Sequence, residues 1–161
     1  MTLHKMWKKA RLWEEAIRVP LIISAPGMKQ GVSCEYTVEL LDLYPTLTAL
    51  ANLPAEPGVQ GQSLVPLLRD SEATLSRSDA LIQVRGGFAL RENEWAYMWY
   101  PASRKHAQDD EMLYNLMADP HQHLNLAANP NFAQLRNRLH TQLTHRLAQA
   151  RGGLESTTEK E

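Results

Sequence analysis

The stretch His4–Gly27, HKMWKKARLWEEAIRVPLIISAPG, joins a basic, aromatic segment directly to a short apolar run. The run Val19–Pro26 is continuously apolar and ends at a Pro-Gly pair, which is typical of a strand covered on both faces in the parallel sheet of an α/β domain. Just upstream, four apolar residues recur at helical spacing: Leu12, Trp13, Ala16 and Ile17. The stretch therefore predicts a short helix that leads into a buried strand.

The composition is that of an ordinary globular protein. Of the 161 residues, 43% are hydrophobic and 22% are charged, and the formal net charge is −1. A net charge so close to zero gives no overall electrostatic attraction to nucleic acids or membranes. No apolar run approaches the roughly 18 residues that span a bilayer. The charged start leads into Trp and Glu rather than into the apolar core of a signal peptide. A single cysteine, Cys34, cannot form an internal disulfide.

Two helical segments follow the first stretch. Residues 40–53 predict a helix with Asp42 as its N-cap and Pro45 in its first turn, where a missing N–H costs little. Its expected apolar face consists of Leu43, Leu47, Leu50 and Ala51. Residues 62–68 predict a short helical turn that closes onto the core. Together with the apolar run, these segments predict an α/β part of the chain.

From about residue 70 the pattern changes to short strands. Residues 71–78 are polar and resemble a linker, and strands are expected at 80–84, 88–91, 95–100 and 112–116. The second and third flank a hairpin turn, and alternation places Trp95, Tyr97 and Trp99 on one face of the sheet. Because no helix separates these strands, we expect a small antiparallel sheet.

The last element is a long helix. Asn129 is its expected cap and Pro130 its first residue, and an apolar stripe runs along it: Phe132, Leu135, Leu139, Leu143 and Leu147. Gly152-Gly153 is the predicted stop, with a disordered tail after it. The predicted fold class is thus α/β, with three parts: residues 1–70, the small sheet and helix of 71–153, and the tail of 154–161.

The basic cluster at the start of the chain permits several interpretations. A lysine ammonium suits an oxyanion such as sulfate or phosphate, Trp7 could pack an organic group, and His4 could exchange a proton near neutral pH. The same residues could form a solvated basic face of a short helix. They also interleave Lys, Arg and Trp as in nucleic-acid binding, but the net charge disfavours that interpretation. Residue types alone leave the first two open.

Other polar residues favour structural roles. The pair His121 and His123 lies in a predicted surface turn without a third metal ligand, and residues 109–111 form an acidic run without the spacing of a calcium loop. His140 and His145 lie off the apolar stripe and are expected to be solvated. Cys34 has no adjacent basic partner that would make it a nucleophile. No phosphate-binding glycine loop and no Gly-x-Ser-x-Gly motif is present.

Four segments, in this order, resemble the C-terminal part of a sulfatase of the alkaline-phosphatase-like superfamily, closest to its iduronate-2-sulfatase-like and choline-sulfatase-like branches. They are His4-x-x-Trp7-x-Lys9 with Leu12–Ala16 and Arg18–Ile22; Leu41–Leu47 continuing through Ala51-x-Leu53-Pro54 to Gly61–Leu68; Ala89–Arg91 leading to Trp95-x-Tyr97; and Leu113–Leu116 with Asp119-Pro120 and Asn125–Ala127. Together they cover the chain to about residue 150.

The resemblance implies a hydrolase of sulfuric esters that uses a formylglycine nucleophile on a divalent metal, usually Ca²⁺. Lys9 matches the lysine that binds the substrate sulfate and is the expected catalytic residue. His4 and Trp7 match positions at the substrate mouth, although the family often has Gly-Glu-His-Gly where this chain has Thr2–Lys5. The implied substrate of the full-length enzyme is a sulfated small molecule or glycan.

The remaining parts of such a site are not in this sequence. Cys34 is followed by Glu35–Val38 rather than by the x-Pro-x-Arg of the formylglycine motif, and the paired aspartates and the Asp-His-Gly segment of the metal site are missing. We therefore expect no cofactor or metal ligand within this chain and, as a partner, the missing N-terminal sulfatase portion. The chain would be a truncated reading frame or a separately encoded part, inactive alone.

A second hypothesis makes the chain a stand-alone, non-catalytic module that binds a partner or a sulfated ligand. The two hypotheses differ in what they require of the surface. Exposed apolar residues where further strands would pack favour the sulfatase part, and a closed, well-covered surface favours the module.

Overall fold

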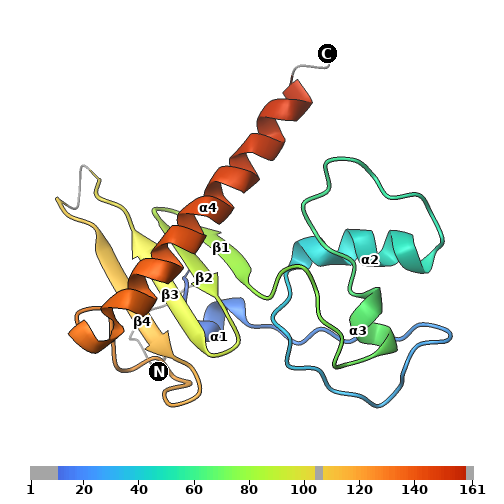
Figure 1. Cartoon of the computed structure of the whole chain (residues 1–161), viewed down its shortest axis with the longest axis horizontal. Coiled ribbons are helices and arrows are strands. Elements are labelled where there is room, and N and C mark those ends of the chain that lie inside the picture. The colour runs from blue at the N-terminus through green and yellow to red at the C-terminus, as the bar shows by residue number, and fades with distance from the viewer. Residues whose placement is uncertain (1–10, 104–106, 159–161) are drawn as a thin grey trace. The chain divides into compact units, whose positions relative to one another are not determined.

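The computed structural model describes residues 11–103 and 107–158 (Figure 1). In chain order the elements are α1 (Glu14–Ile17), the 3₁₀ turn η1 (Leu40–Asp42), α2 (Leu43–Leu50), α3 (Val65–Arg69), β1 (Ala80–Val84), β2 (Gly87–Arg91), β3 (Trp95–Tyr100), β4 (Asp110–Asn115), η2 (Pro130–Phe132) and α4 (Ala133–Thr158).

The described residues form two compact units. The sheet unit contains residues 11–19 and 81–148, and the helical unit contains residues 20–80 and 149–158. The structure thus groups residues 11–19 with the sheet and residues 71–80 with the helices, whereas the sequence suggested parts of 1–70 and 71–153. The polypeptide passes from one unit to the other directly after α1.

The sheet unit is built on four strands in the order β1-β2-β3-β4. β2 pairs antiparallel with β3, with Phe88 opposite Trp99, and β3 pairs antiparallel with β4, with Tyr97 opposite Leu113. The predicted small antiparallel sheet is confirmed, and each strand lies within two residues of its predicted bounds. The strands could be predicted because their signals, the alternation of apolar residues and the turn residues between strands, are local in the sequence.

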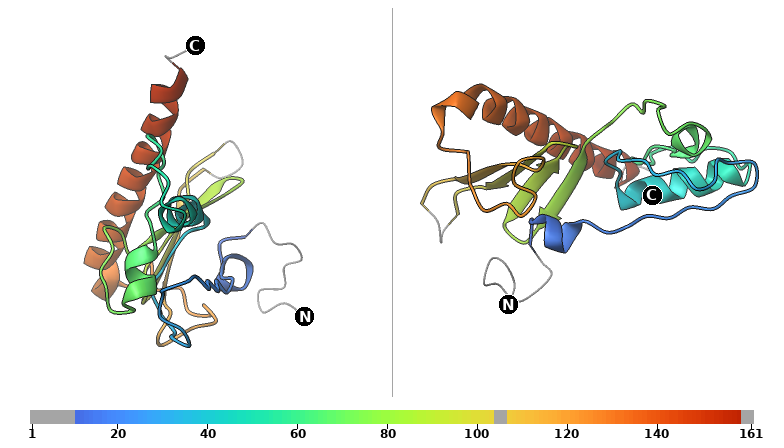
Figure 2. Two further views of the ribbon diagram at one scale, coloured as in Figure 1. Left: turned by 90° about the vertical axis from the view of Figure 1, so that its right-hand side faces the viewer. Right: turned by 90° about the horizontal axis from the view of Figure 1, so that it is seen from below.

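The two faces of this sheet are covered by different elements. One face packs Leu90, Tyr97 and Leu113 against Leu139 and Leu143 of α4. The other face packs Ala89, Ala96 and Met98 against Leu12, which precedes α1 and has no exposed surface. Figure 2 shows α4 and α1 on opposite sides of the strands. The predicted grouping of Trp95, Tyr97 and Trp99 on one face is confirmed, because all three belong to the α4 side.

The start of the last helix also follows the sequence. The Asn129 side chain accepts a hydrogen bond from the Asn131 N–H at 3.0 Å, and Pro130 opens η2, which leads into α4. The predicted stop at Gly152-Gly153 is wrong, since α4 continues to Thr158 and takes in residues assigned to the tail. An interior glycine costs a helix only about 1 kcal/mol, which need not end it.

The helical unit departs further from the prediction. Helix α2 lies within its predicted range but ends at Leu50 rather than Leu53, and α3 ends one residue beyond the predicted 62–68. Residues 19–26, predicted as a buried strand, belong to no strand, and Leu21 and Ile22 are exposed. An apolar run forms a strand only when a neighbouring strand accepts its hydrogen bonds, and no strand of the described residues pairs with this one.

Candidate functional site

The three residues that the sequence assigned to a site, His4, Trp7 and Lys9, lie outside the residues that the structure describes. The described chain begins two residues after Lys9. What the structure does show is how the following segment is held, and which surfaces and polar clusters lie elsewhere in each unit.

The segment that follows Lys9 is fixed to the sheet unit through Glu14. Its carboxylate accepts hydrogen bonds from Arg91 of β2, from Nε at 2.7 Å and from Nη2 at 3.3 Å. Its backbone N–H donates to Oε1 of Gln122 at 2.8 Å. This N–H lies in the first turn of α1, where a helix has no acceptor of its own. Gln122 therefore acts as the cap that the N-cap residue of α1 does not provide.

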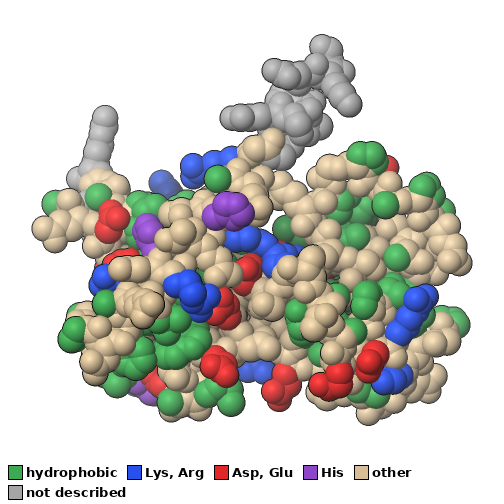
Figure 3. All heavy atoms as spheres, viewed as in Figure 1, with side chains coloured by type: hydrophobic (Ala, Val, Ile, Leu, Met, Phe, Trp, Pro, Cys, Tyr) green, Lys and Arg blue, Asp and Glu red, His purple; other side chains and the backbone are tan. Residues whose placement is uncertain are grey.

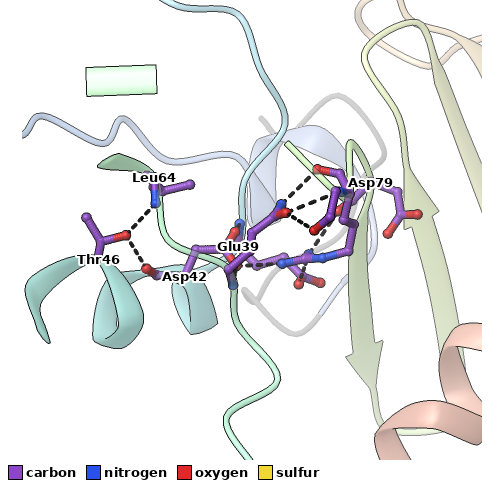
Figure 4. Close-up of polar contacts among 8 residues, drawn as sticks. Glu39, Asp42, Thr46, Leu64 and Asp79 are labelled. Atoms are coloured by element: carbon purple, nitrogen blue, oxygen red, sulfur yellow. Dashed lines mark hydrogen bonds and ion pairs between the residues drawn. The ribbon is translucent and has the colours of Figure 1, made fainter. Parts of the chain in front are cut away.

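A second polar cluster lies in the helical unit and is centred on Asp42 (Figure 4). The buried Asp42 carboxylate accepts from the Glu39 N–H at 2.8 Å, the Gln62 N–H at 2.9 Å and Nη2 of Arg77 at 2.5 Å. Arg77 also donates to the Glu39 carboxylate. Asp42 is the N-cap residue of α2, as the sequence predicted, but its carboxylate makes no cap bond to that helix. Asp42 instead joins three parts of the chain.

The close packing of this cluster gives structural roles to two further residues, Thr46 and Gly61. Thr46 donates to the Asp42 carbonyl and accepts from the Leu64 N–H at 2.8 Å. Gly61 lies so close to the Leu41 carbonyl that an added Cβ would stand 2.1 Å from its oxygen. Any side chain at this position would displace backbone, so glycine is required here by space. The cluster is a structural latch between residues 39–46, 61–64 and 77.

Around that latch, the helical unit has little apolar core. Among the described residues, only three of its apolar side chains are buried: Leu64, Val65 and Ala80. Nine large apolar side chains of the same unit are exposed: Leu21, Ile22, Val32, Leu40, Leu41, Tyr44, Leu47, Leu53 and Val59. We call this set the apolar surface. Figure 3 shows hydrophobic side chains at the surface of this unit. A stable monomer rarely leaves so many exposed together.

Part of the apolar surface is hollowed. A cavity of about 240 Å³ lies beside α2, and its lining includes the apolar residues Tyr44, Pro45, Leu53 and Val59. Glu56 is the one charged residue of its lining. Thr48 and Ser63 add hydroxyl groups, so the lining mixes polar and apolar side chains.

A third cluster, which the sequence did not predict, lies in the sheet unit. Tyr97 donates to the Glu111 carboxylate, and its hydroxyl lies 2.8 Å from Nδ1 of His140. Burial, and next the bond to Glu111, raise the pKa of Tyr97 well above its ordinary value. His140 also packs edge-on against Trp99, with ring centroids 5.1 Å apart. The expectation that His140 and the 109–111 run are merely solvated is therefore wrong for His140 and Glu111.

Three further histidines lie at the surface, as the sequence predicted. His121 and His123 are exposed with ring centroids 5.9 Å apart, and His145 is exposed. Cys34 is free and exposed. Within residues 11–103 and 107–158, no group of three or more His, Cys, Asp or Glu side chains could hold a metal ion. A search of the same residues finds no helix both long and apolar enough to cross a membrane.

The sequence is similar to a known protein family and to several characterised proteins. The family model described as N-sulphoglucosamine sulphohydrolase, C-terminal, matches residues 3–149. The choline-sulfatase of Rhizobium meliloti is 37% identical over 131 residues, which cover 78% of this chain and 24% of the relative. The ulvan-active sulfatase of Formosa agariphila is 28% identical over 154 residues, covering 89% and 29% respectively.

A solved structure agrees in fold. The structure of BT1596, a 2-O GAG sulfatase, matches with a TM-score of 0.65 and 24% identity, over 81% of this chain and 30% of that one. The chain thus spans less than a third of the length of each of these relatives. The family match covers nearly all of the sequence, and the fold agrees with it. The chain belongs to the sulfatase family and corresponds to its C-terminal part.

Proposed function

We propose that this chain supplies the C-terminal portion of a sulfatase and completes an active site together with an N-terminal portion that carries the nucleophile and the metal ligands. The observation that carries the proposal is the apolar surface of the helical unit. Three buried apolar residues against nine large exposed ones leave this unit without a sufficient core of its own. The remaining sheet of a sulfatase is the partner that would bury them.

The unpaired run at residues 19–26 supports the same partner. Its backbone groups pair with no strand of the described chain, and its exposed side chains include Ile22 at 91%. An extended apolar segment of this kind is suited to add to a sheet edge, because a new neighbour satisfies its N–H and C=O groups. These features argue against the stand-alone module, which requires a covered surface.

In the proposed site Lys9 binds the substrate sulfate. Its ammonium would place a positive charge beside the sulfate oxygens, where negative charge grows as the ester bond breaks. His4 and Trp7 would line the substrate mouth, Trp7 by packing against the organic group. The formylglycine and the Ca²⁺ expected of full-length relatives would supply the nucleophile and its activation. Their ligands are assigned to the N-terminal portion.

The proposed substrate class is a sulfated small molecule or glycan. The relatives named above support this range: one is a choline-sulfatase, one an ulvan-active sulfatase and one a 2-O GAG sulfatase. These relatives share a sulfate group as the reacting part of the substrate but differ in the organic group. This agrees with a site in which the lysine binds the sulfate and other residues bind the remainder of the substrate.

The test is reconstitution. The chain is co-produced with the Rhizobium meliloti choline-sulfatase shortened to the residues before its match, in cells that form formylglycine. We expect the two pieces to co-elute in size-exclusion chromatography and to hydrolyse choline sulfate, whereas the chain alone does not hydrolyse 4-nitrocatechol sulfate. In the reconstituted pair Lys9→Ala should lower kcat by about 10²–10³, the cost of removing one charge-stabilising donor.

Lys8→Ala is the matched control, since it removes the same charge one position away. Equal activity of Lys9→Ala and the unchanged pair would disprove the role of Lys9. A chain that stays monomeric, binds no apolar dye and does not co-elute would overturn the proposal in favour of the stand-alone module. Turnover of 4-nitrocatechol sulfate by the purified chain would show that it needs no partner.

A further inference from the structure

We propose that the hollow beside α2 is a socket for a basic side chain, Lys or Arg, of the N-terminal sulfatase portion. This inference rests on the proposed function and names the contact that anchors the two portions to each other. Every residue of the lining belongs to the helical unit, and Glu56 is the one charged residue among them. The basic side chain would pair with Glu56.

The first argument is the size and lining of the socket. Its volume of about 240 Å³ lies below the roughly 300–1,000 Å³ of pockets that bind drug-sized ligands, so a single long side chain fits it better. The lining is mixed, with apolar groups from Tyr44, Leu53 and Val59 and hydroxyls from Thr48 and Ser63. Lysine and arginine side chains are mixed in the same way, because an apolar stem carries a charged head.

The second argument is that the socket offers acceptors. Thr48 Oγ1 shares its one proton between the carbonyls of Tyr44 at 3.2 Å and Pro45 at 3.1 Å, so its oxygen can only accept from a further group. The Glu56 carboxylate also only accepts, and in the described part of the chain it has no hydrogen bond or ion pair. An ammonium or guanidinium supplies the donors that these oxygens need.

The third argument is that the loop carrying Glu56 is fixed before a partner binds. Asn52 follows α2 with a φ of 53°, and the N–H groups of Asn52 and Leu53 donate to carbonyls of α2 at 3.2 and 2.9 Å. These two bonds form a Schellman motif, which sets the direction of the chain after the helix. Pro54 and Pro57 on either side of Glu56 then restrict the backbone. A socket that is already ordered loses little conformational entropy on binding.

The fourth argument is that the helix beside the socket turns its apolar side outwards. Asp42 and Thr46, one turn apart, have no exposed surface, whereas Leu40, Tyr44 and Leu47 are 74%, 52% and 62% exposed. A surface helix normally has the opposite arrangement. The latch holds Asp42 and Thr46 in place, so the helix cannot rotate to cover its apolar stripe without breaking those bonds. Tyr44 belongs both to the stripe and to the socket, so a partner that covers the stripe would also exclude water from a pair with Glu56.

The test measures the dissociation constant between the full chain and the shortened choline-sulfatase by biolayer interferometry. We expect Glu56→Lys to weaken binding by at least about thirtyfold and Glu56→Gln by about tenfold, because each leaves the partner's cation desolvated without its carboxylate. Glu72→Lys is the matched control, since it makes the same charge change at another exposed glutamate of the helical unit, and it should bind within about twofold of the unchanged chain. Urea unfolding of each variant reports whether the chain remains folded, and Glu56→Gln, which keeps the shape of the side chain, decides if Glu56→Lys does not.

A photo-crosslinker then identifies the anchor. Benzoylphenylalanine replaces Ala51, an exposed residue between the lining residues Ala49 and Leu53. We expect it to capture a segment of the choline-sulfatase portion that contains a Lys or Arg. Changing that residue to Glu should weaken binding to the unchanged chain and restore binding to the Glu56→Lys chain, as a direct charge pair requires.

Binding of Glu56→Lys or Glu56→Gln as tight as that of the unchanged chain would overturn the inference, and so would a captured segment without a basic residue. Crosslinks between two copies of this chain would overturn it in favour of self-association. Because binding is measured without turnover, the two proposals can fail separately. A pair that depends on Glu56 but does not hydrolyse choline sulfate would keep the socket and disprove the proposed function. An active pair that ignores Glu56 would do the reverse, and pieces that do not bind at all would disprove both.

Discussion

Arg77 Nη2 donates to Oδ1 of Asp42 at 2.5 Å, across 35 positions of sequence and onto a carboxylate with no exposed surface. The pair is not isolated, since Asp42 also accepts two backbone N–H groups and Arg77 also donates to Glu39. A buried charge with all its partners present is tolerated, but removing one partner leaves the others desolvated and unpaired. The latch should therefore determine the stability of the helical unit.

Asp42→Ala should destabilise the chain by about 3–5 kcal/mol, the range for breaking a buried ion pair by removing one partner. Two backbone N–H groups would lose their acceptor in addition to the guanidinium. The measurement is urea-induced unfolding followed by circular dichroism.

Asp70→Asn is the matched control in the same unit. Asp70 pairs with Lys29 at 3.0 Å, but the two side chains are 60% and 51% exposed. Surface pairs of this kind contribute little to stability, because solvent screens the two charges. If Asp42→Ala unfolded at the same urea concentration as Asp70→Asn, the latch would not hold the unit together.

The latch also shows where sequence reasoning stops. The strands and α4 were predicted because their signals are local: alternation in Trp95–Tyr100, the cap at Asn129 and the stripe through Leu143. Asp42 was assigned a local role as N-cap because its partner Arg77 lies far along the chain, in a segment that resembled a polar linker. The contact of Tyr97 with Glu111 and His140 could not be predicted either, because these residues also lie far apart in the sequence. Only the register of β3 with β4 and the packing of α4 on the sheet bring them together.

The prediction of a buried strand at Val19–Pro26 was wrong for a different reason. Its apolar residues favour burial, but hydrophobicity alone does not identify the strand that would cover them. In the described chain no strand lies beside it, so Ile22 is exposed rather than covered. The proposed site was accessible to sequence only through family resemblance, because Lys9 resembles any surface lysine by residue type.

Tyr97 predicts a dependence of stability on alkaline pH. Its folded pKa is raised by burial, so the protein favours the neutral hydroxyl. The contribution of the neutral Tyr97 to stability is therefore fully present below about pH 10, the ordinary pKa of tyrosine. It is lost as pH rises from there towards the pKa of Tyr97 in the folded protein. Tyr97→Phe should cost roughly 0.5–1.5 kcal/mol at pH 8, where it removes the hydroxyl's hydrogen bonds.

Above pH 10 the difference between Tyr97→Phe and the unchanged chain should shrink, because phenylalanine has no proton to lose. Urea unfolding at a series of pH values from 8 to 11 measures it. A difference that stays constant over this range would show that Tyr97 titrates no later in the folded protein than in the unfolded one.

Asp119 predicts the opposite trend at acid pH. The Leu124 N–H donates to its carboxylate at 2.8 Å, and this bond, the largest cause, lowers the pKa of Asp119 below its ordinary value of 3.8. Its contribution to stability is present above that value and is lost as pH falls through the folded pKa. Titration of the Asp119 side-chain carboxyl by carbon-detected magnetic resonance should give a midpoint below 3.8. A midpoint at or above it would mean that the Leu124 bond does not persist in solution.

The apolar surface predicts a variant that separates assembly from stability. Ile22 is 91% exposed in the described chain, so Ile22→Asp should leave the free energy of unfolding of the isolated chain within about 0.5 kcal/mol of its original value. The same change should lower the binding of an apolar dye and abolish co-elution with the shortened choline-sulfatase, because a carboxylate cannot enter a buried sheet without a partner. Met117→Asp is the control, since Met117 is 74% exposed but belongs to the sheet unit. If Ile22→Asp still co-elutes and Met117→Asp does not, the partner binds the sheet unit, and the apolar surface of the helical unit is not where the sulfatase is completed.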